Sequence, residues 1–139
     1  MKLQKLTPNM IVNDVKESVE FYVEILGFKL NMAVPENNEI VENDLREDET
    51  YSYAMISRDE VSIMFVKKDV FEEDHLFLKD SVIGASVSFY IDVDDVNEIY
   101  ISVKDRAEIV IDLRTAWYGM QEFYIRDCNG YILGFAEKK

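Results

Sequence analysis

Hydrophobic and polar residues follow two patterns along the chain, one with the period of a β-strand and one with the period of an α-helix. The segment VKESVEFYVEIL has the helical pattern. We expect one face of this helix to carry Val15, Val19, Tyr22, Val23 and Leu26. Asp14 is placed to cap its first turn together with Glu17, and Gly27 is placed to end it. The segment DDVNEIYISVK predicts a second helix later in the chain.

Short apolar stretches bounded by turn residues predict β-strands on both sides of each helix. In the first half they are LTPNMIVNDV, FKLNMAV, SYAMIS and VSIMFV, with a hairpin around residues 58–60 joining the last two. In the second half they are SVSFYIDV, AEIVIDL, QEFYIRD and GYILGFAE. Asn129-Gly130 predicts a tight turn before the last strand, because both residues tolerate a positive φ. Each half therefore has the order βαβββ.

The two halves also repeat in sequence. VNDVKES aligns with VDDVNEI and SIMFVKK aligns with ILGFAEKK, which pairs Asp14 with Asp95 and Phe65 with Phe135. We therefore expect a single domain over residues 1–139, made of repeat unit 1–68 and repeat unit 84–139. The acidic stretches 35–50 and 69–81 are then excursions on a compact fold. Within the first of them, residues 36–49 are interpreted either as a lid or as a solvated loop.

This doubled unit resembles the vicinal oxygen chelate superfamily, which includes glyoxalase I, extradiol dioxygenases and bleomycin resistance proteins. The resemblance is carried by PNMIVNDVKESVEFYVEILGFKL near the start, by WYGMQEFYIRDCNGYILGFAE at the end, and by the repeat itself. Cys128 stands where the family usually has a proline. The resemblance implies an α+β fold in which two βαβββ units form a curved mixed sheet around a cleft.

In metal-using members of the family, each unit supplies histidine or carboxylate ligands from its first and last strands. The resemblance places the first-strand positions at Thr7 and Ser88, and the last-strand positions at Met64 and Gly134. Hydroxyl groups, a thioether and a glycine lack the imidazole and carboxylate donors that hold Zn, Ni, Mn or Fe(II). We therefore predict no metal ion at these positions, and we assign no cofactor.

Gly134 is unusual because it lies inside a predicted strand, where glycine weakens the structure. One interpretation is that it removes a side chain from the floor of a ligand cavity, with the flexible side chain of Met64 lining the opposite wall. The other interpretation is a β-bulge or close packing between strands, with no ligand nearby.

Aromatic residues supply the other candidate ligand contacts. Trp117 and Tyr118 lie in a predicted loop, where the core does not account for them, and the resemblance places this loop beside the cleft. We expect them to stack on a planar or cationic ligand, with Arg114 fixing an anionic group. Alternatively, Trp117 fills the loop or a dimer interface. Tyr53 and Phe123 are further candidates, although aromatic residues on strands more often belong to the core.

The composition limits the possible partners. The 139-residue chain has 28 Asp or Glu and 15 Lys or Arg residues, which gives a formal net charge of -13. Nucleic acids and anionic membranes are polyanions that bind basic patches, so neither is an expected partner. A neutral or cationic small molecule fits this charge better. No apolar run has the length of a membrane span.

The few reactive residues exclude several classes of site. Cys128 is the single cysteine, which rules out an internal disulfide and a cysteine-based zinc cluster. His75 is the single histidine and lies in an acidic stretch distant in sequence from Cys128, so no Ser-His-Asp or Cys-His arrangement is expected. The opening segment MKLQKLTPNM lacks the apolar core of a signal peptide, and we expect a cytoplasmic protein.

These observations and the resemblance lead to one functional hypothesis and two alternatives. We predict a metal-free small-molecule binding protein of the bleomycin-resistance type, which sequesters a ligand in an apolar cleft and forms a homodimer as such relatives do. The first alternative is a metal-dependent enzyme of the glyoxalase or dioxygenase type, which Thr7 and Ser88 disfavour. The second is an interaction module whose cleft is filled by its own side chains.

Overall fold

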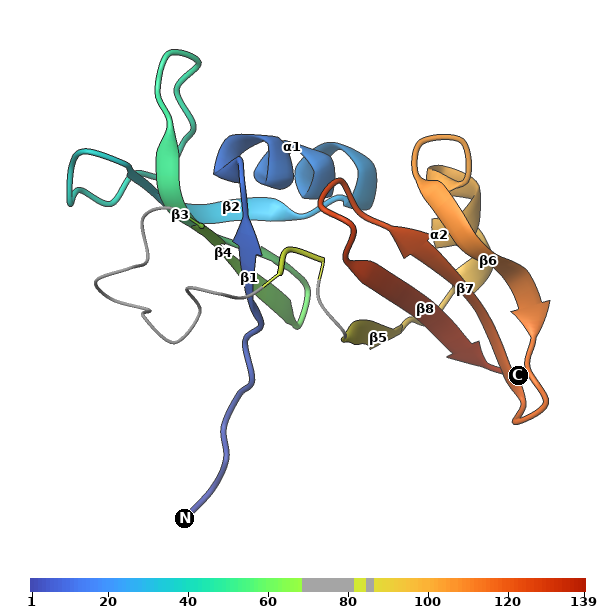
Figure 1. The fold of residues 1–139 in the computed structure, drawn as a ribbon. Helices are drawn as coiled ribbons and strands as arrows, with labels where there is room; N and C mark the ends of the chain where they lie inside the picture. The colour runs from blue at the N-terminus through green and yellow to red at the C-terminus, as the bar shows by residue number, and fades with distance from the viewer. Residues whose placement is uncertain (69–81, 85–86) are drawn as a thin grey trace. The chain divides into compact units, whose positions relative to one another are not determined.

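The structure, a computed structural model, describes residues 1–68, 82–84 and 87–139 (Figure 1). The chain divides into two compact units, Met1–Val82 and Ile83–Lys139, and each is described by itself. His75 and the acidic stretch 69–81 lie outside the described residues. Within the part of the chain that is described, no helix is both long enough and apolar enough to cross a membrane.

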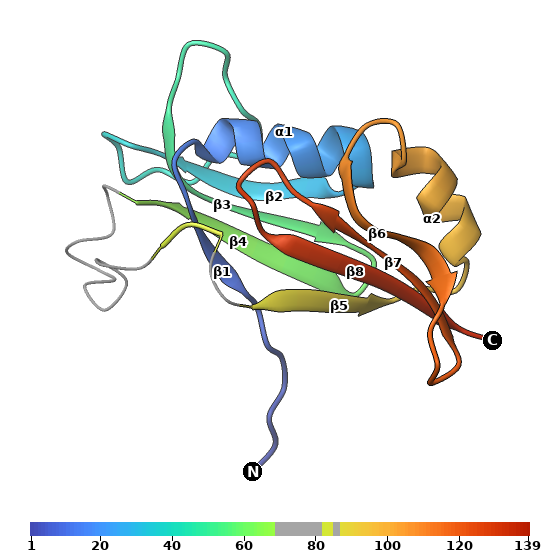
Figure 2. The same cartoon turned by 45° about the vertical axis from the view of Figure 1, so that its right-hand side comes forward.

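Unit 1 has the predicted order βαβββ (Figure 2). Its elements are β1 (Asn9–Val12), α1 (Val15–Leu26), β2 (Lys29–Pro35), β3 (Tyr51–Arg58) and β4 (Val61–Lys67). The strands form one sheet in the order β1-β4-β3-β2, in which β1 is parallel to β4 and the other neighbours are antiparallel. Helix α1 packs on this sheet against β2, β3 and β4.

Unit 2 repeats this architecture. Its elements are β5 (Ser88–Asp92), α2 (Val96–Val103), β6 (Glu108–Thr115), β7 (Met120–Arg126) and β8 (Ile132–Lys138). The sheet order is β5-β8-β7-β6, again with one parallel pair, β5 with β8. Helix α2 packs against β7 and β8. The predicted α+β class and the paired βαβββ units are thereby confirmed.

The register of the strands supports the alignment of the two repeats. Met10 lies opposite Phe65 in unit 1, and Ile91 lies opposite Phe135 in unit 2. Each of these first-strand residues comes four positions before the Asp that caps the following helix. The equivalence inferred from the sequence is therefore also an equivalence of positions in the strand register.

The core of unit 1 differs in one place from the predicted helix face. Val15, Val19, Tyr22 and Leu26 are buried as expected. Val23 is 37% exposed, and Ser18 is buried in its stead. The Ser18 hydroxyl donates to the carbonyl oxygen of Asp14 at 2.8 Å, which satisfies the polar group inside the core. Val23 lies at the border of the apolar stripe of α1, where the helix surface changes from the buried face to the solvent-exposed face.

The turn between β7 and β8 is a hairpin, but its geometry differs from the prediction. Gly130 has a φ of 90°, whereas Asn129 does not have a positive φ. The carboxylate of Asp127 instead accepts hydrogen bonds from the backbone N–H groups of Asn129 and Tyr131, both at 2.8 Å. A side chain before the turn therefore fixes it, and only the glycine needs the left-handed region.

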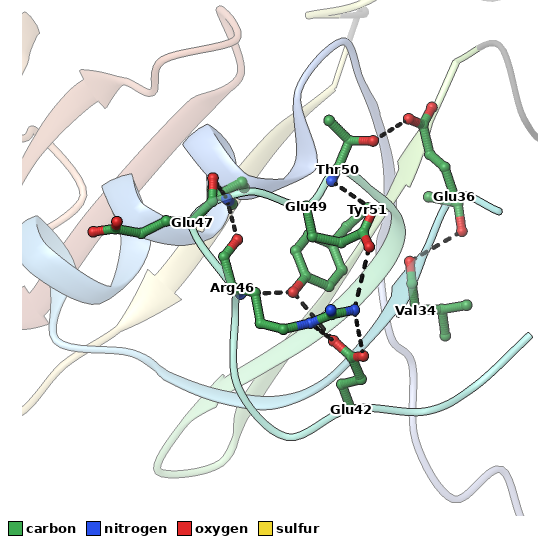
Figure 3. A network of polar contacts seen from close by, with 10 residues as sticks. Val34, Glu36, Glu42, Arg46, Glu47, Glu49, Thr50 and Tyr51 are labelled. Carbon is green, nitrogen blue, oxygen red and sulfur yellow. Dashed lines mark hydrogen bonds and ion pairs between the residues drawn. The ribbon is translucent and has the colours of Figure 1, made fainter. Parts of the chain in front are cut away.

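The acidic segment 36–49 is held to unit 1 by its own polar contacts (Figure 3). The guanidinium of Arg46 pairs with Glu42 at 2.8 Å, and the backbone N–H of Arg46 donates to the Tyr51 hydroxyl at 2.7 Å. Glu42 also forms a backbone bridge to β2. The ammonium of Lys16 on α1 donates to the carbonyl of residue 47 at 2.9 Å. The segment is therefore anchored to its own unit, a feature that neither the lid nor the solvated-loop interpretation included.

Candidate functional site

The sheet of unit 2 has one face against α2 and one face turned away from it. The ring of Phe123 packs against Tyr100 of α2 with 5.1 Å between centroids, and Phe123 is completely buried. Because side chains alternate along a strand, Glu122 and Tyr124 point to the opposite face. Tyr124 lies directly opposite Gly134 on β8, which in turn lies opposite Tyr90 on β5. We call this the distal face of unit 2.

A carboxylate and three tyrosines meet on the distal face. Glu122 is buried with 0% exposure. Its Oε2 atom accepts a hydrogen bond from the Tyr90 hydroxyl at 2.5 Å, and its Oε1 atom accepts one from the Tyr118 hydroxyl. The ring of Tyr124 lies beside that of Tyr90, with 6.3 Å between centroids. We call Glu122, Tyr90, Tyr118 and Tyr124 the Glu122 cluster.

The cluster raises the pKa of all three phenols. Burial raises the pKa of Tyr90 most, followed by its hydrogen bond to Glu122. For Tyr118 the hydrogen bond to Glu122 is the largest cause of the raised pKa. Burial, and then the charge of Glu122, raises the pKa of Tyr124. The phenols therefore keep their protons over a wider pH range than usual and remain hydrogen-bond donors.

Gly134 makes room for a tyrosine ring. A Cβ atom on Gly134 would come within 2.5 Å of the Tyr124 Cε2 atom and within 2.9 Å of its Cδ2 atom, closer than real Cβ contacts allow. The space above this glycine is thus taken by a side chain of the adjacent strand. Close packing, the second of the two interpretations of Gly134, accounts for the residue without a ligand.

The β6–β7 turn carries the two aromatic residues singled out in the sequence. Gly119, with a φ of 90°, closes the turn by donating its N–H to the carbonyl of Ala116 at 2.9 Å. Trp117 is 95% exposed, so it does not fill the loop. Its ring meets the edge of Tyr118 at 5.3 Å between centroids, and Tyr118 reaches back to the carboxylate of Glu122. The turn thus presents an aromatic surface directly beside the Glu122 cluster.

Arg114 is the basic residue that lies nearest the cluster in strand register, directly opposite Glu122 on β6. Its side chain is exposed. Among the described residues, no Lys, Arg or His nitrogen lies within the 4.0 Å ion-pair limit of the Glu122 carboxylate. The charge of Arg114 nevertheless opposes the effect of burial on the pKa of Tyr124. Arg114 is therefore a neighbour of the cluster that does not neutralise it.

In unit 1, two candidates from the sequence share the face turned away from α1. Met55 lies opposite Met64, and Tyr53 lies opposite Val66, so Tyr53 and Met64 are diagonal neighbours on β3 and β4. Tyr53 is half-buried, and burial raises the pKa of its phenol.

The sequence patterns singled out neither Glu122 nor Tyr90 and Tyr124 as ligand contacts. Phe123 was selected instead. It is adjacent to Glu122 on β7, and adjacent residues of a strand point to opposite faces of the sheet. A usable signal was present: Glu122 is an acidic residue directly before the apolar stretch 123–125, and it points to the same side of the strand as Tyr124. Phe123 lies in the core and is not brought together with Trp117 and Tyr118.

The residues at the family's metal positions do not fit a divalent ion. Strand register places Met64 and Gly134 at equivalent positions, each one residue before the aligned phenylalanine. Thr7 precedes β1, and Ser88 begins β5. These side chains offer no imidazole or carboxylate. Moreover, within residues 1–68, 82–84 and 87–139, no three His, Cys, Asp or Glu residues are grouped as metal ligands.

Comparison with known proteins identifies the family. The model of the Glyoxalase/Bleomycin resistance protein/Dioxygenase superfamily matches residues 5–135. The chain belongs to this superfamily. No curated protein sequence is similar enough to the chain to count as a match.

Several solved structures share the fold of this chain. The bleomycin-binding protein of Streptomyces verticillus, solved with copper(II)-bleomycin, is 18% identical, with a TM-score of 0.63 and 100% of this chain and 99% of that chain covered. TioX from Micromonospora sp. ML1 is 20% identical, with a TM-score of 0.66 and coverages of 98% and 99%. A glyoxalase/bleomycin resistance protein/dioxygenase from Nocardioides is 13% identical, with a TM-score of 0.73 and coverages of 99% and 85%. At these identities the similarity concerns the fold.

Proposed function

We propose that this superfamily member binds a small molecule without a metal ion and sequesters it, as a bleomycin resistance protein does, rather than transforming it. The observation that carries the proposal is the set of side chains at the four family metal positions, Thr7, Met64, Ser88 and Gly134, which lack metal donors. A chain that keeps the fold and lacks these donors retains a binding surface without the Lewis acid that the family's chemistry uses.

The proposed binding surface is the aromatic turn together with the distal face of unit 2. Trp117 and Tyr118 offer ring surface to solvent, and the Tyr118 hydroxyl donates to the buried carboxylate of Glu122. Exposed aromatic residues held on a tight turn beside a buried polar group are typical of ligand contacts. The bleomycin-binding neighbour supports a small-molecule partner and supplies a first probe, bleomycin.

The other candidate residues take supporting roles in the proposal. Met64 and Tyr53 are candidate apolar contacts on the sheet of unit 1, considered by itself. Gly134 seats the Tyr124 ring, and Phe123 holds β7 against α2. Arg114 offers a cation to an anionic group of the ligand.

Binding can be followed with the protein as purified, without chelator. N-phenyl-1-naphthylamine, a neutral aromatic probe, should gain fluorescence saturably on addition of the protein, and bleomycin should change the emission of Trp117, the single tryptophan. Both signals should be unchanged by EDTA. Trp117→Ala should weaken the naphthylamine signal several-fold, whereas Glu42→Gln in unit 1 should leave it unchanged.

Elemental analysis of the same preparation decides between the proposal and the metal-dependent enzyme. We expect no transition metal in stoichiometric amount. A bound transition metal whose removal abolishes probe binding would overturn the proposal, as would the absence of saturable binding for both probes.

We also propose that the protein acts as a homodimer. Among the described residues of unit 2, the strand β6 pairs with β7 alone, so its other edge has no strand partner there. Association is a common way to cover such edges. Sedimentation velocity at micromolar concentration should give a species of twice the 16.3 kDa chain mass. A 16.3 kDa species alone would contradict the dimer without affecting ligand binding.

A further inference from the structure

The carboxylate of Glu122 is buried, and no cation from the described part of the chain pairs with it. Both of its oxygen atoms accept a hydrogen bond from a phenolic hydroxyl group, so its acceptor positions face neutral donors. Within the described residues no basic side chain forms an ion pair with it. A buried carboxylate is costly unless it is compensated, and two neutral phenols compensate it only in part. A positive charge placed beside Glu122 would therefore stabilise the buried carboxylate.

The hydroxyl groups that hold Glu122 leave the tyrosine rings available. Tyr90 is 46% exposed and Tyr118 is 47% exposed, although the oxygen of each is bonded to the buried carboxylate. Trp117 extends this surface edge-on to Tyr118. A ligand that approaches from solvent therefore contacts the aromatic rings first, and the negative charge of Glu122 behind the rings acts on it. Rings of this kind attract cations through their quadrupole, most strongly where water is excluded.

This combination selects one class of ligand. At the aromatic rings an anionic group is repelled by the buried carboxylate, whereas Arg114 on the neighbouring strand β6 can still pair with an anionic group elsewhere on the same ligand. A hard divalent ion requires six or more oxygen ligands, which a single carboxylate and phenols already engaged as donors do not supply. A neutral apolar molecule fits the rings but leaves the carboxylate uncompensated. An organic ammonium ion satisfies both features, since its charge compensates Glu122 and its alkyl groups contact the rings.

We propose that Tyr90, Tyr118 and Trp117, with Glu122 behind them, form a recognition site for an organic ammonium group. This assignment rests on the proposed binding function and names the chemical class that the same site takes. Arg114, opposite Glu122 in register, is the protein's own cation that could compete with a ligand for this carboxylate. It lies close enough to influence the cluster but remains outside ion-pair distance. An arriving ammonium group does not have to break an existing ion pair.

A pair of probes of equal shape separates charge from apolar contact. Choline carries a quaternary ammonium group, and 3,3-dimethyl-1-butanol has a carbon atom in place of the nitrogen and no charge. Titration of the intact protein, followed by Trp117 emission, should show saturable binding of choline in the millimolar range. The neutral alcohol should bind about tenfold more weakly, the difference expected from a cation over aromatic rings.

Variants assign the selectivity to particular side chains. Glu122→Gln should weaken choline about tenfold and leave the neutral alcohol unchanged. Glu42→Gln is the matched control: Glu42 also accepts a tyrosine hydroxyl, from Tyr51 at 3.2 Å, but it has its own cation in Arg46 (Figure 3). This variant removes the same charge from unit 1 and should leave both affinities unchanged. Circular dichroism checks that each variant is folded.

If Glu122→Gln does not fold, Tyr118→Leu, in the exposed turn, replaces it and should weaken choline more than the neutral alcohol. Equal binding of the two probes, equal loss of choline affinity in Glu122→Gln and Glu42→Gln, or no saturable signal with choline would each overturn the ammonium site. In those cases N-phenyl-1-naphthylamine still reports on the proposed binding function. Loss of binding of the naphthylamine and of bleomycin as well would remove the function itself.

Discussion

At the scale of single residues, Gly134 and Tyr124 explain each other. The ring of Tyr124 lies over Gly134, where a Cβ atom would come within 2.5 Å of it. Covering a strand glycine with a cross-strand aromatic ring offsets the weakness that glycine introduces. The same packing positions the Tyr124 ring beside Tyr90 at the Glu122 cluster. Gly134, which in the sequence alone indicates only a missing side chain, is therefore part of the packing that forms the site.

A double-mutant cycle tests this packing. Gly134→Ala should destabilise the protein by about 1–3 kcal/mol, because the new methyl group overpacks the Tyr124 ring. In a Tyr124→Ala background the same substitution should be neutral or slightly stabilising, since alanine suits a strand better than glycine. Urea denaturation gives the free energy of unfolding of all four proteins. Equal effects of Gly134→Ala in both backgrounds would show that the ring is not what the glycine accommodates.

The raised phenol pKa values predict how stability depends on pH. Below the usual tyrosine pKa of about 10, the phenols are protonated in both the folded and the unfolded chain, and their contribution to stability is complete. As the pH rises above that value, the unfolded phenols ionise first, so the free energy of unfolding should fall. Urea denaturation between about pH 8 and pH 11 measures this fall.

Glu122→Gln identifies the part of that pH dependence that belongs to the cluster. The hydrogen bond to Glu122 is the main cause of the raised pKa of Tyr118, so the alkaline loss of stability should become smaller in this variant. It should not vanish, because Tyr100 has a pKa raised chiefly by its hydrogen bond to Asp112. An alkaline loss identical in the variant and the parent protein would contradict the pKa directions given for the cluster.

At the scale of elements, the repeat is expressed through equivalent helix caps. The carboxylate of Asp14 accepts the N–H of Glu17 at 3.0 Å, and that of Asp95 accepts the N–H of Glu98 at 3.0 Å. Each cap starts the helix that covers one sheet, so a residue at the same point of each repeat has the same structural task. The C-terminal ends differ: α1 stops at Gly27 with a φ of 70°, whereas α2 ends without a glycine.

The two caps can be compared directly. Asp14→Ala and Asp95→Ala should each lower the free energy of unfolding by about 0.5–2 kcal/mol, because each leaves a first-turn N–H group without its acceptor. Asp→Asn at either position should cost much less, since asparagine also caps. Thermal and urea unfolding of the four variants measure these effects. A cost for asparagine as large as for alanine would show that charge, and not the hydrogen bond, is what matters there.

The elements were predictable from the sequence to the extent that local signals determine them. The α1 helix begins and ends at the residues that its cap and its glycine indicated, and Asp14 and Asp95 cap the helices of the two repeats. The Glu122 cluster was not predictable in this way. Glu122, Tyr90 and Tyr118 come from β7, β5 and a turn, and their contact depends on the strand order β5-β8-β7-β6. No local sequence pattern indicates that strand order. The sequence also does not tell which residues of β7 face α2, and this had to be known before Phe123 could be excluded as a ligand contact.

At the scale of the whole molecule, the net charge of -13 acts on every charged ligand before any contact is made. An excess of acidic groups attracts cations over a distance set by the ionic strength, about 30 Å at 0.01 M salt and about 10 Å at 0.1 M. This long-range attraction is separate from the local effect of Glu122, which is buried and therefore weakly screened. Binding of a cation should accordingly contain one part that salt removes and one part that it does not.

The salt dependence of choline binding separates the two parts. Raising sodium chloride from about 0.01 M to about 0.3 M should weaken choline binding several-fold while leaving 3,3-dimethyl-1-butanol unaffected. In Glu122→Gln the affinity for choline should be lower at every salt concentration, but the relative loss with salt should stay the same, because the remaining acidic residues still produce the field. If the variant instead lost its salt dependence, the attraction would come from Glu122 alone. The overall charge would then serve only to keep the protein apart from its neighbours in solution.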